Sequence, residues 1–241
     1  MIYEKNGIIP ASMCDATTKL SVISVFQLVE DAVTDLMADL HIDGITAMRE
    51  YGAMWVFVKN AIRIFRRPEW REPYVIRSYI SSFSAVKLMI DTEILSQKDQ
   101  SPLAQSRLEL CALDLQTGKI RKASSVGISS ETQCFHSVEG LDFSRFPKKE
   151  SEIVDKVRVL STNIDYCSHT NNIEYVRFML NTYSVKELAE NEIEKIEIHY
   201  GMQTFENDIL SICKSGEDNH DFFAVCSEKG NAVECKIDFK R

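Results

Sequence analysis

The densest group of side chains able to do chemistry is the run Asn-Ile-Asp-Tyr-Cys-Ser-His-Thr-Asn-Asn, which stands directly before a predicted helix. An acid, a thiol and an imidazole occupy alternate positions, as Asp165, Cys167 and His169. Side chains two apart face the same way in an extended segment, so we expect the three to line one surface. The helix start at Asn171 and Asn172 supplies N–H groups with partial positive charge. These parts suit an attack on a carbonyl group.

A second interpretation of the same segment involves no chemistry. Asp165 or Asn171 would cap the helix, as Asp and Asn commonly do at helix starts. His169 would then be an ordinary surface histidine. The residue types and their spacing leave both interpretations open.

The first part of the chain contains the elements of one layered unit. Apolar residues at three- and four-residue steps predict a helix over 22–40, and Ser21 is its expected N-cap. A period of two then predicts strands over 55–58, 61–65, 74–79, 86–90 and 107–113. A hairpin turn is expected at 115–118.

The second part repeats this order in a shorter form. The expected elements are a strand over 154–160, a helix over 172–183 and strands over 193–200, 208–213, 221–227 and 232–239. Residues 15–23 can be laid over 165–173, and 65–73 over 200–208, in the same order along the chain. Two such matches indicate an internal duplication.

The duplication predicts an α+β fold in which each half is a long helix wrapped by an antiparallel sheet. We expect the halves at 1–123 and 152–241, joined by a connecting segment over 124–151, with the reactive segment confined to the second half.

Several motifs resemble those of the plant and bacterial acyl-acyl carrier protein (acyl-ACP) thioesterases. In the second half the pattern Asp-x-x-x-His-x-Asn-Asn, an apolar residue, x and Tyr is met by Asp165, His169, Asn171, Asn172, Ile173 and Tyr175. In the first half the matching segments are Trp55-Val56, Arg67-Pro68-x-Trp70 and Ala112-Leu-Asp114 with Thr117-Gly118.

The resemblance implies two tandem hotdog folds. It also implies hydrolysis of the thioester between a fatty acyl group and the phosphopantetheine arm of acyl carrier protein, which ends chain elongation, without a metal or cofactor. The alternatives are an acyl-CoA thioesterase of the same fold and an acyl-binding hotdog protein with impaired catalysis.

The sequence departs from the family's catalytic pattern at two positions. The family has Asp-x-Asn-x-His and a Glu at a strand end; Cys167 stands where the Asn is usual, and Gln203 replaces the Glu. An amide orients water but does not take its proton. We therefore expect His169 to act as the base, Asp165 to orient the site and Gln203 to hold water. Cys167 is either a small filler or a nucleophile.

Charge and composition limit the partners. Lys and Arg number 28 against 36 Asp and Glu, a net charge of −8 that disfavours nucleic acid. Because acyl carrier protein is also acidic, a local basic patch is needed for docking. We expect it at Arg66 and Arg67, near Arg63 and Arg71; the alternative patch is Lys119, Arg121 and Lys122.

No apolar run approaches the ~20 residues of a membrane span. The start of the chain shows no secretory signal pattern, and the 7 scattered cysteines indicate a reducing, cytoplasmic setting. The sequence leaves open whether the chain works as a monomer or a homodimer.

Overall fold

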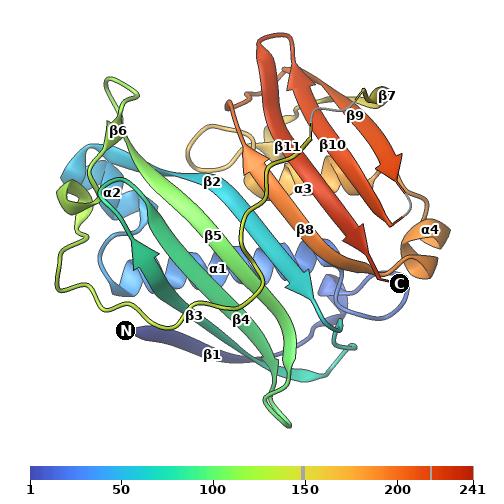
Figure 1. Ribbon diagram of the computed structural model, residues 1–241, viewed down its shortest axis with the longest axis horizontal. Helices are drawn as coiled ribbons and strands as arrows, with labels where there is room; N and C mark the ends of the chain where they lie inside the picture. Colours follow the sequence, from blue (N-terminus) through green and yellow to red (C-terminus); the bar gives the residue numbers. More distant parts are fainter. Residues whose placement is uncertain (148–149, 218, 241) are drawn as a thin grey trace. The chain divides into compact units, whose positions relative to one another are not determined.

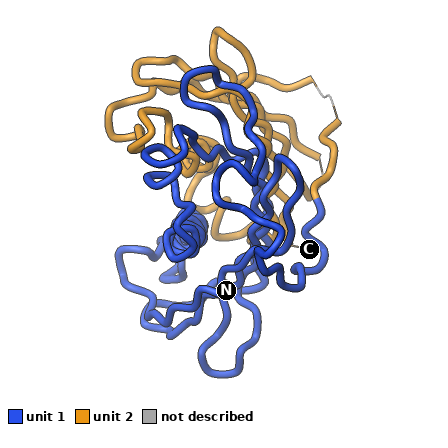
Figure 2. The backbone as a smooth tube through the Cα atoms, turned by 90° about the vertical axis from the view of Figure 1, so that its left-hand side faces the viewer, with its two compact units in different colours: residues 1–142 blue, residues 143–241 orange. Residues whose placement is uncertain are grey.

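The computed structural model describes residues 1–147, 150–217 and 219–240. The chain divides into two compact units, Met1–Asp142 and Phe143–Arg241, named here the N-terminal and the C-terminal unit (Figure 2). Each unit has an antiparallel sheet and a principal helix of its own.

The N-terminal unit is a sheet with helix α1 (Val22–Asp39) behind it in the view of Figure 1. The spatial order of its strands is β1 (Ile2–Ile8), β3 (Pro73–Phe83), β4 (Leu88–Ser96), β5 (Pro102–Asp114) and β2 (Ala53–Ile64), with β6 (Ile120–Arg121) also paired to β5. A shorter helix, α2 (Gly44–Tyr51), connects α1 to β2. Every pairing is antiparallel.

Helix α1 begins and packs as its sequence predicts. The Ser21 hydroxyl accepts a hydrogen bond from the Ser24 N–H at 3.1 Å, so the predicted N-cap is confirmed. The helix lies against β1, β3 and β4. Its apolar stripe is buried there and forms much of the core, with Phe26, Val29, Val33 and Leu36 among its members.

The C-terminal unit repeats this topology. Its strands follow the spatial order β7 (Glu152–Arg158), β9 (Ile209–Glu217), β10 (His220–Ser227), β11 (Gly230–Phe239) and β8 (Ile193–Tyr200). Helices α3 (Asn172–Leu180) and α4 (Val185–Glu190) lie between β7 and β8 in sequence. Corresponding strands occupy the same places in both sheets, which confirms the predicted α+β tandem hotdog.

The loop before the long helix has the same backbone in both units. Isolated bridges join Cys14 to Leu20 and Ile164 to Thr170, and the residue two before each bridge end has a positive φ, 63° at Thr18 and 65° at Ser168. The overlay of residues 15–23 on residues 165–173, an offset of 150 residues, is therefore confirmed.

The overlay of residues 65–73 on residues 200–208, an offset of 135 residues, is wrong by one residue. Arg71 and Asn207 share a positive φ and donate equivalent backbone hydrogen bonds, to Ile9 and Val159. The offset here is thus 136 residues, and Gln203 corresponds to Arg67. The overlay aligned the aromatic residues Phe65 and Tyr200 at the strand ends. The true correspondence follows the backbone hydrogen bonds, which residue types do not reveal.

Other boundaries also differ from the predictions. The helix predicted over 172–183 ends at Leu180, and α3 has 9 residues against the 18 of α1. The two strands predicted over 55–65 are one strand, β2, interrupted by a bulge between Phe57 and Lys59. The edge strand β1 was not predicted.

An irregular segment after β6 lies across the N-terminal sheet. Val138 and Leu141 are buried, and the Val138 N–H donates to the carboxylate of Asp91 at 2.8 Å. Asp91 is itself fully buried and takes two hydrogen bonds from Arg107, whose guanidinium also donates to the Val138 carbonyl. The ion pair therefore ties two strands to the segment that crosses them.

We expect the substitution Arg107→Met to lower the free energy of unfolding by about 3–5 kcal/mol, because it leaves the buried Asp91 without its charge partner. Urea denaturation measures the change. Lys186→Ala is the control, since the exposed pair of Lys186 with Glu190 contributes about 0.5 kcal/mol or less. Equal losses for the two variants would contradict the assigned role of Arg107.

Candidate active site

The loop that precedes α3 is a closed turn. The Asp165 N–H donates to the His169 carbonyl at 2.9 Å, and the Ser168 N–H donates to the Asp165 carbonyl at 3.0 Å. The expectation of an extended segment is therefore wrong: these bonds fold the backbone back on itself between Ile164 and Thr170. Alternation of side chains along a strand does not apply in such a turn.

The Asp165 carboxylate organises this loop. One of its oxygens accepts the Cys167 N–H at 2.8 Å and lies 3.5 Å from the His169 N–H. Asp15 holds the N-terminal loop in the same way, through the Thr17 N–H at 2.9 Å. Each aspartate thus serves first as a backbone acceptor.

The start of α3 is largely satisfied by Asn171. Its side-chain oxygen accepts the Ile173 N–H at 2.8 Å and its carbonyl accepts the Glu174 N–H, while its own N–H donates to Asn163. Asn171 is therefore the helix cap. Asn172 is the first residue of α3, so its N–H has no acceptor within the helix.

His169 is half-buried beside an aromatic ring that was not predicted as part of the site. Its imidazole meets the ring of Phe205 edge-on, with the ring centroids 5.1 Å apart. Phe205 is an exposed aromatic residue that follows Gln203 by two positions. That exposure has no signature in the sequence.

A backbone hydrogen bond connects the His169 loop to the segment that carries Gln203. The Thr170 N–H donates to the Thr204 carbonyl at 2.9 Å, and the Leu20 N–H donates to the Pro68 carbonyl at 2.8 Å in the N-terminal unit. Gln203, which is exposed, therefore stands in the same relation to its loop as Arg67 does.

In the N-terminal unit this position is filled by a cation. The Arg67 guanidinium forms an ion pair with Asp15 and lies 3.4 Å from the Thr17 hydroxyl. Burial alone would raise the pKa of Asp15, but hydrogen bonds from Thr17 and Arg67 outweigh it and lower that pKa. A side chain at this position can thus reach the loop carboxylate.

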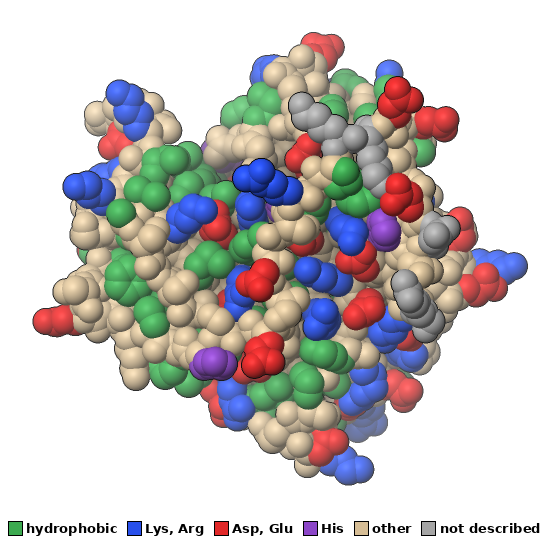
Figure 3. All heavy atoms as spheres, viewed as in Figure 1, with side chains coloured by type: hydrophobic (Ala, Val, Ile, Leu, Met, Phe, Trp, Pro, Cys, Tyr) green, Lys and Arg blue, Asp and Glu red, His purple; other side chains and the backbone are tan. Residues whose placement is uncertain are grey.

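The expected docking patch is corrected in part. Arg67 is only 9% exposed and paired with Asp15, so its charge is not presented to a partner. Arg66 is more exposed but forms a double hydrogen bond with Glu72, at 2.6 and 2.8 Å. On the face shown in Figure 3, Lys and Arg side chains are interspersed with Asp and Glu.

Cys167 is half-buried, and burial raises the pKa of its thiol; the nearby charge of Asp165 raises it further. The group is therefore the neutral thiol near neutral pH, which is unfavourable for a nucleophile.

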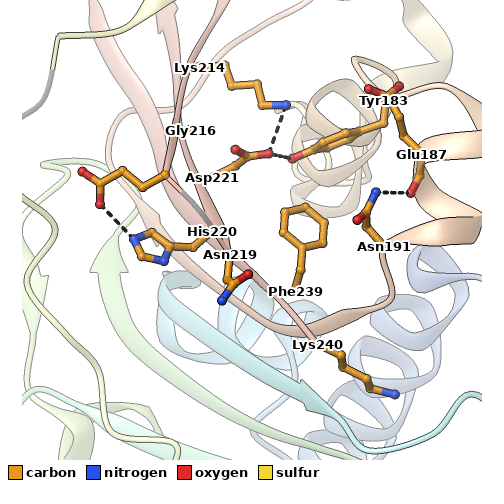
Figure 4. A pocket seen from close by; sticks show the side chains of 11 residues that line it. Tyr183, Glu187, Asn191, Lys214, Gly216, Asn219, His220, Asp221, Phe239 and Lys240 are labelled. Carbon is orange, nitrogen blue, oxygen red and sulfur yellow. Dashed lines mark hydrogen bonds and ion pairs between the residues drawn. The ribbon is translucent and has the colours of Figure 1, made fainter.

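A pocket of about 390 Å³ lies elsewhere in the C-terminal unit, lined by α4 and by β9, β10 and β11 (Figure 4). Two pairs of ionisable side chains in its lining contact each other, Lys214 with Asp221 at 3.0 Å and His220 with Glu217 at 3.1 Å. The predicted site residues do not line it.

Across residues 1–147, 150–217 and 219–240, no group of three or more His, Cys, Asp and Glu side chains is arranged to hold a metal ion. None of the helices in the same residues combines the length and apolar character that a membrane-spanning segment needs.

Known proteins resemble this chain in both sequence and structure. Residues 1–124 match the family model for the acyl-ACP thioesterase N-terminal domain, and residues 147–240 match the model for its C-terminal domain. A search of curated proteins finds no match.

Three solved structures share the fold over nearly their whole length. An acyl-ACP thioesterase from Bacteroides thetaiotaomicron has a TM-score of 0.90 at 17% identity, with 99% of this chain and 98% of that chain covered. The 12:0-ACP thioesterase from Umbellularia californica has a TM-score of 0.90 at 13% identity, covering 99% and 97%. A protein described as an oleoyl thioesterase from Lactobacillus plantarum has a TM-score of 0.83 at 17% identity, covering 100% and 96%.

The two family matches include both units and the loop around His169. The chain belongs to the acyl-ACP thioesterase family and is a thioester hydrolase acting on fatty acyl-ACP.

Proposed function

We propose that hydrolysis takes place in the C-terminal unit, at the loop before α3. One observation carries this proposal: two loops with the same backbone differ in the side chains that matter for chemistry. The N-terminal loop has Lys19 and the Asp15–Arg67 ion pair, whereas the C-terminal loop has His169 and a neutral glutamine, Gln203, at the corresponding positions. The second set leaves an imidazole and an amide to act on water.

In the proposed reaction, His169 takes a proton from water as the water oxygen attacks the thioester carbonyl. Gln203 holds that water through its amide group. The carbonyl oxygen gains negative charge, which the Asn172 N–H and the positive end of α3 stabilise. Collapse of the intermediate breaks the carbon–sulfur bond, and the protonated His169 returns its proton to the leaving thiolate.

Asp165 acts in this scheme through the backbone. By holding the Cys167 N–H it keeps the loop closed, and the closed loop determines where the imidazole of His169 lies. Cys167 fills space beside it, because its raised pKa keeps it a thiol.

The proposed partner is acyl carrier protein bearing a fatty acyl chain on its phosphopantetheine arm, and release of the free fatty acid ends elongation. Of the two residues expected to dock acyl carrier protein, Arg66 and Arg67, only Arg66 remains a candidate. All seven cysteines are free, which supports a reducing, cytoplasmic setting.

We expect His169→Ala to lower kcat for release of free fatty acid from acyl-ACP by roughly 100- to 10,000-fold, since the general base is removed. Lys19→Ala is the matched control at the same place in the N-terminal loop and should keep parental kcat. Parental kcat in His169→Ala would exclude this histidine as the base.

The substitutions Cys167→Ala and Cys167→Ser decide between filler and nucleophile. If the thiol only fills space, both variants keep kcat within about tenfold of the parent, because a small core change perturbs geometry modestly. Loss of all activity in Cys167→Ala, with parental melting temperature, would indicate covalent catalysis instead.

We expect Gln203→Arg to abolish activity without loss of stability. The new guanidinium should pair with Asp165 as Arg67 pairs with Asp15, placing a cation where water is held. Steady-state kinetics and thermal unfolding give the two readouts, and Gln203→Ala serves as the comparison that removes the amide without adding charge. Full activity in Gln203→Arg would show that this position is remote from the chemistry.

A further inference from the structure

Three hydroxyl groups meet in the interior of the C-terminal unit, next to the proposed catalytic loop. The Thr204 hydroxyl lies 2.7 Å from that of Thr170 and 2.7 Å from that of Tyr175. Thr204 is fully buried, and the other two side chains are nearly so. We name these three residues the hydroxyl cluster.

One arrangement of hydrogens satisfies every donor in the hydroxyl cluster. Thr170 donates to the Thr204 carbonyl at 3.1 Å, Thr204 donates to the Thr170 hydroxyl, and Tyr175 donates to the Thr204 hydroxyl. Burial also raises the pKa of Tyr175, so that its hydroxyl stays protonated and able to donate. A fully satisfied network of this kind fixes geometry more narrowly than apolar contacts do.

The hydroxyl cluster connects three pieces of chain: the His169 loop, the segment that carries Gln203 and Phe205, and the start of α3. Thr170 directly follows His169, and Thr204 stands between Gln203 and Phe205, whose ring contacts the imidazole. Tyr175 belongs to the first turns of α3, the helix whose N-terminus faces the loop. A shift in any one hydroxyl would therefore move the loop relative to the strand end or the helix.

The N-terminal unit shows that the fold does not need these hydroxyls. The corresponding residues there are Leu20, Val25 and Pro68, all buried and all apolar, while the backbone hydrogen bond between the two segments is retained. Buried hydroxyls carry a desolvation cost that apolar side chains avoid. The C-terminal unit, which contains the candidate site, has buried hydroxyls where the N-terminal unit has apolar side chains. The needs of folding alone therefore do not explain the hydroxyl cluster.

We propose that Thr204 and Tyr175 are positioning residues that hold His169 and Gln203 at a fixed separation. The inference rests on the proposed role of His169 as base. Neither hydroxyl reaches substrate, since both are buried and engaged with each other.

The test removes each hydroxyl without changing the shape of its side chain. Thr204→Val and Tyr175→Phe should each lower kcat for acyl-ACP by about 10- to 100-fold with little change in KM, because a small misplacement of a catalytic group is costly. Thr204→Ser, which keeps the hydroxyl, should restore most of the lost kcat. Parental kcat in both Thr204→Val and Tyr175→Phe would overturn the proposal.

Tyr183→Phe is the matched control. The Tyr183 hydroxyl is likewise hydrogen-bonded within this unit, to Asp221 (Figure 4). Tyr183 follows the C-terminal end of α3, whereas Tyr175 lies near its N-terminal end. We expect parental kcat for this variant. If it loses as much kcat as Tyr175→Phe, loss of any such hydroxyl is harmful and the positioning role fails.

Two more readouts separate positioning from general stability. The double variant Thr204→Val/Tyr175→Phe should have a kcat no lower than the worse single variant, because both changes break one network. The His169 ring-proton resonance, which the neighbouring Phe205 ring displaces, should move in Thr204→Val and stay in place in Tyr183→Phe. Additive losses in kcat or an unmoved resonance would overturn the proposal.

The result for His169→Ala distinguishes this proposal from the proposed function. If that variant is inactive and the hydroxyl-cluster variants keep parental kcat, only the positioning role fails. If His169→Ala keeps parental kcat, the proposed function fails, and the hydroxyl cluster with it.

Discussion

A carboxylate that accepts backbone N–H groups closes the loop before the long helix in each unit, and the rest of the site depends on this interaction. Asp15 and Asp165 hold the N–H two residues on, at 2.9 and 2.8 Å. The closed loop then presents the helix cap, Ser21 or Asn171, at the start of the helix. Without it, neither the helix N-terminus nor the side chains of the loop would have a defined position.

Because the two loops share this backbone, the difference in chemistry between the units comes from a few side chains. Arg67 neutralises Asp15 in the N-terminal unit, and Gln203 stands in its place in the C-terminal unit. In the N-terminal unit the arginine occupies the loop carboxylate by forming an ion pair with it. In the proposed reaction, the neutral amide at this position holds the water that His169 deprotonates.

Buried carboxylates also hold the irregular segment against the sheets. Asp91 accepts the Val138 N–H in the N-terminal unit, and Glu197 accepts the Ser144 N–H at 2.6 Å in the C-terminal unit. Backbone groups in a loop have no ladder partners, so a loop that covers a sheet needs side chains to satisfy them. Each carboxylate is stabilised in turn by a nearby cationic or polar group, Arg107 in the first case and His199 in the second.

Local patterns in the sequence determined the two principal helices and their first residues, most of the strands, and the family. These follow from periodicity, capping and motif spacing, which act over a few residues. Only the tertiary structure decided that Arg67 is buried against Asp15, that Gln203 rather than its neighbour corresponds to that arginine, and that Phe205 contacts His169. Such pairs join segments far apart in the chain, and strand register and loop closure, which leave no local signature, bring them together.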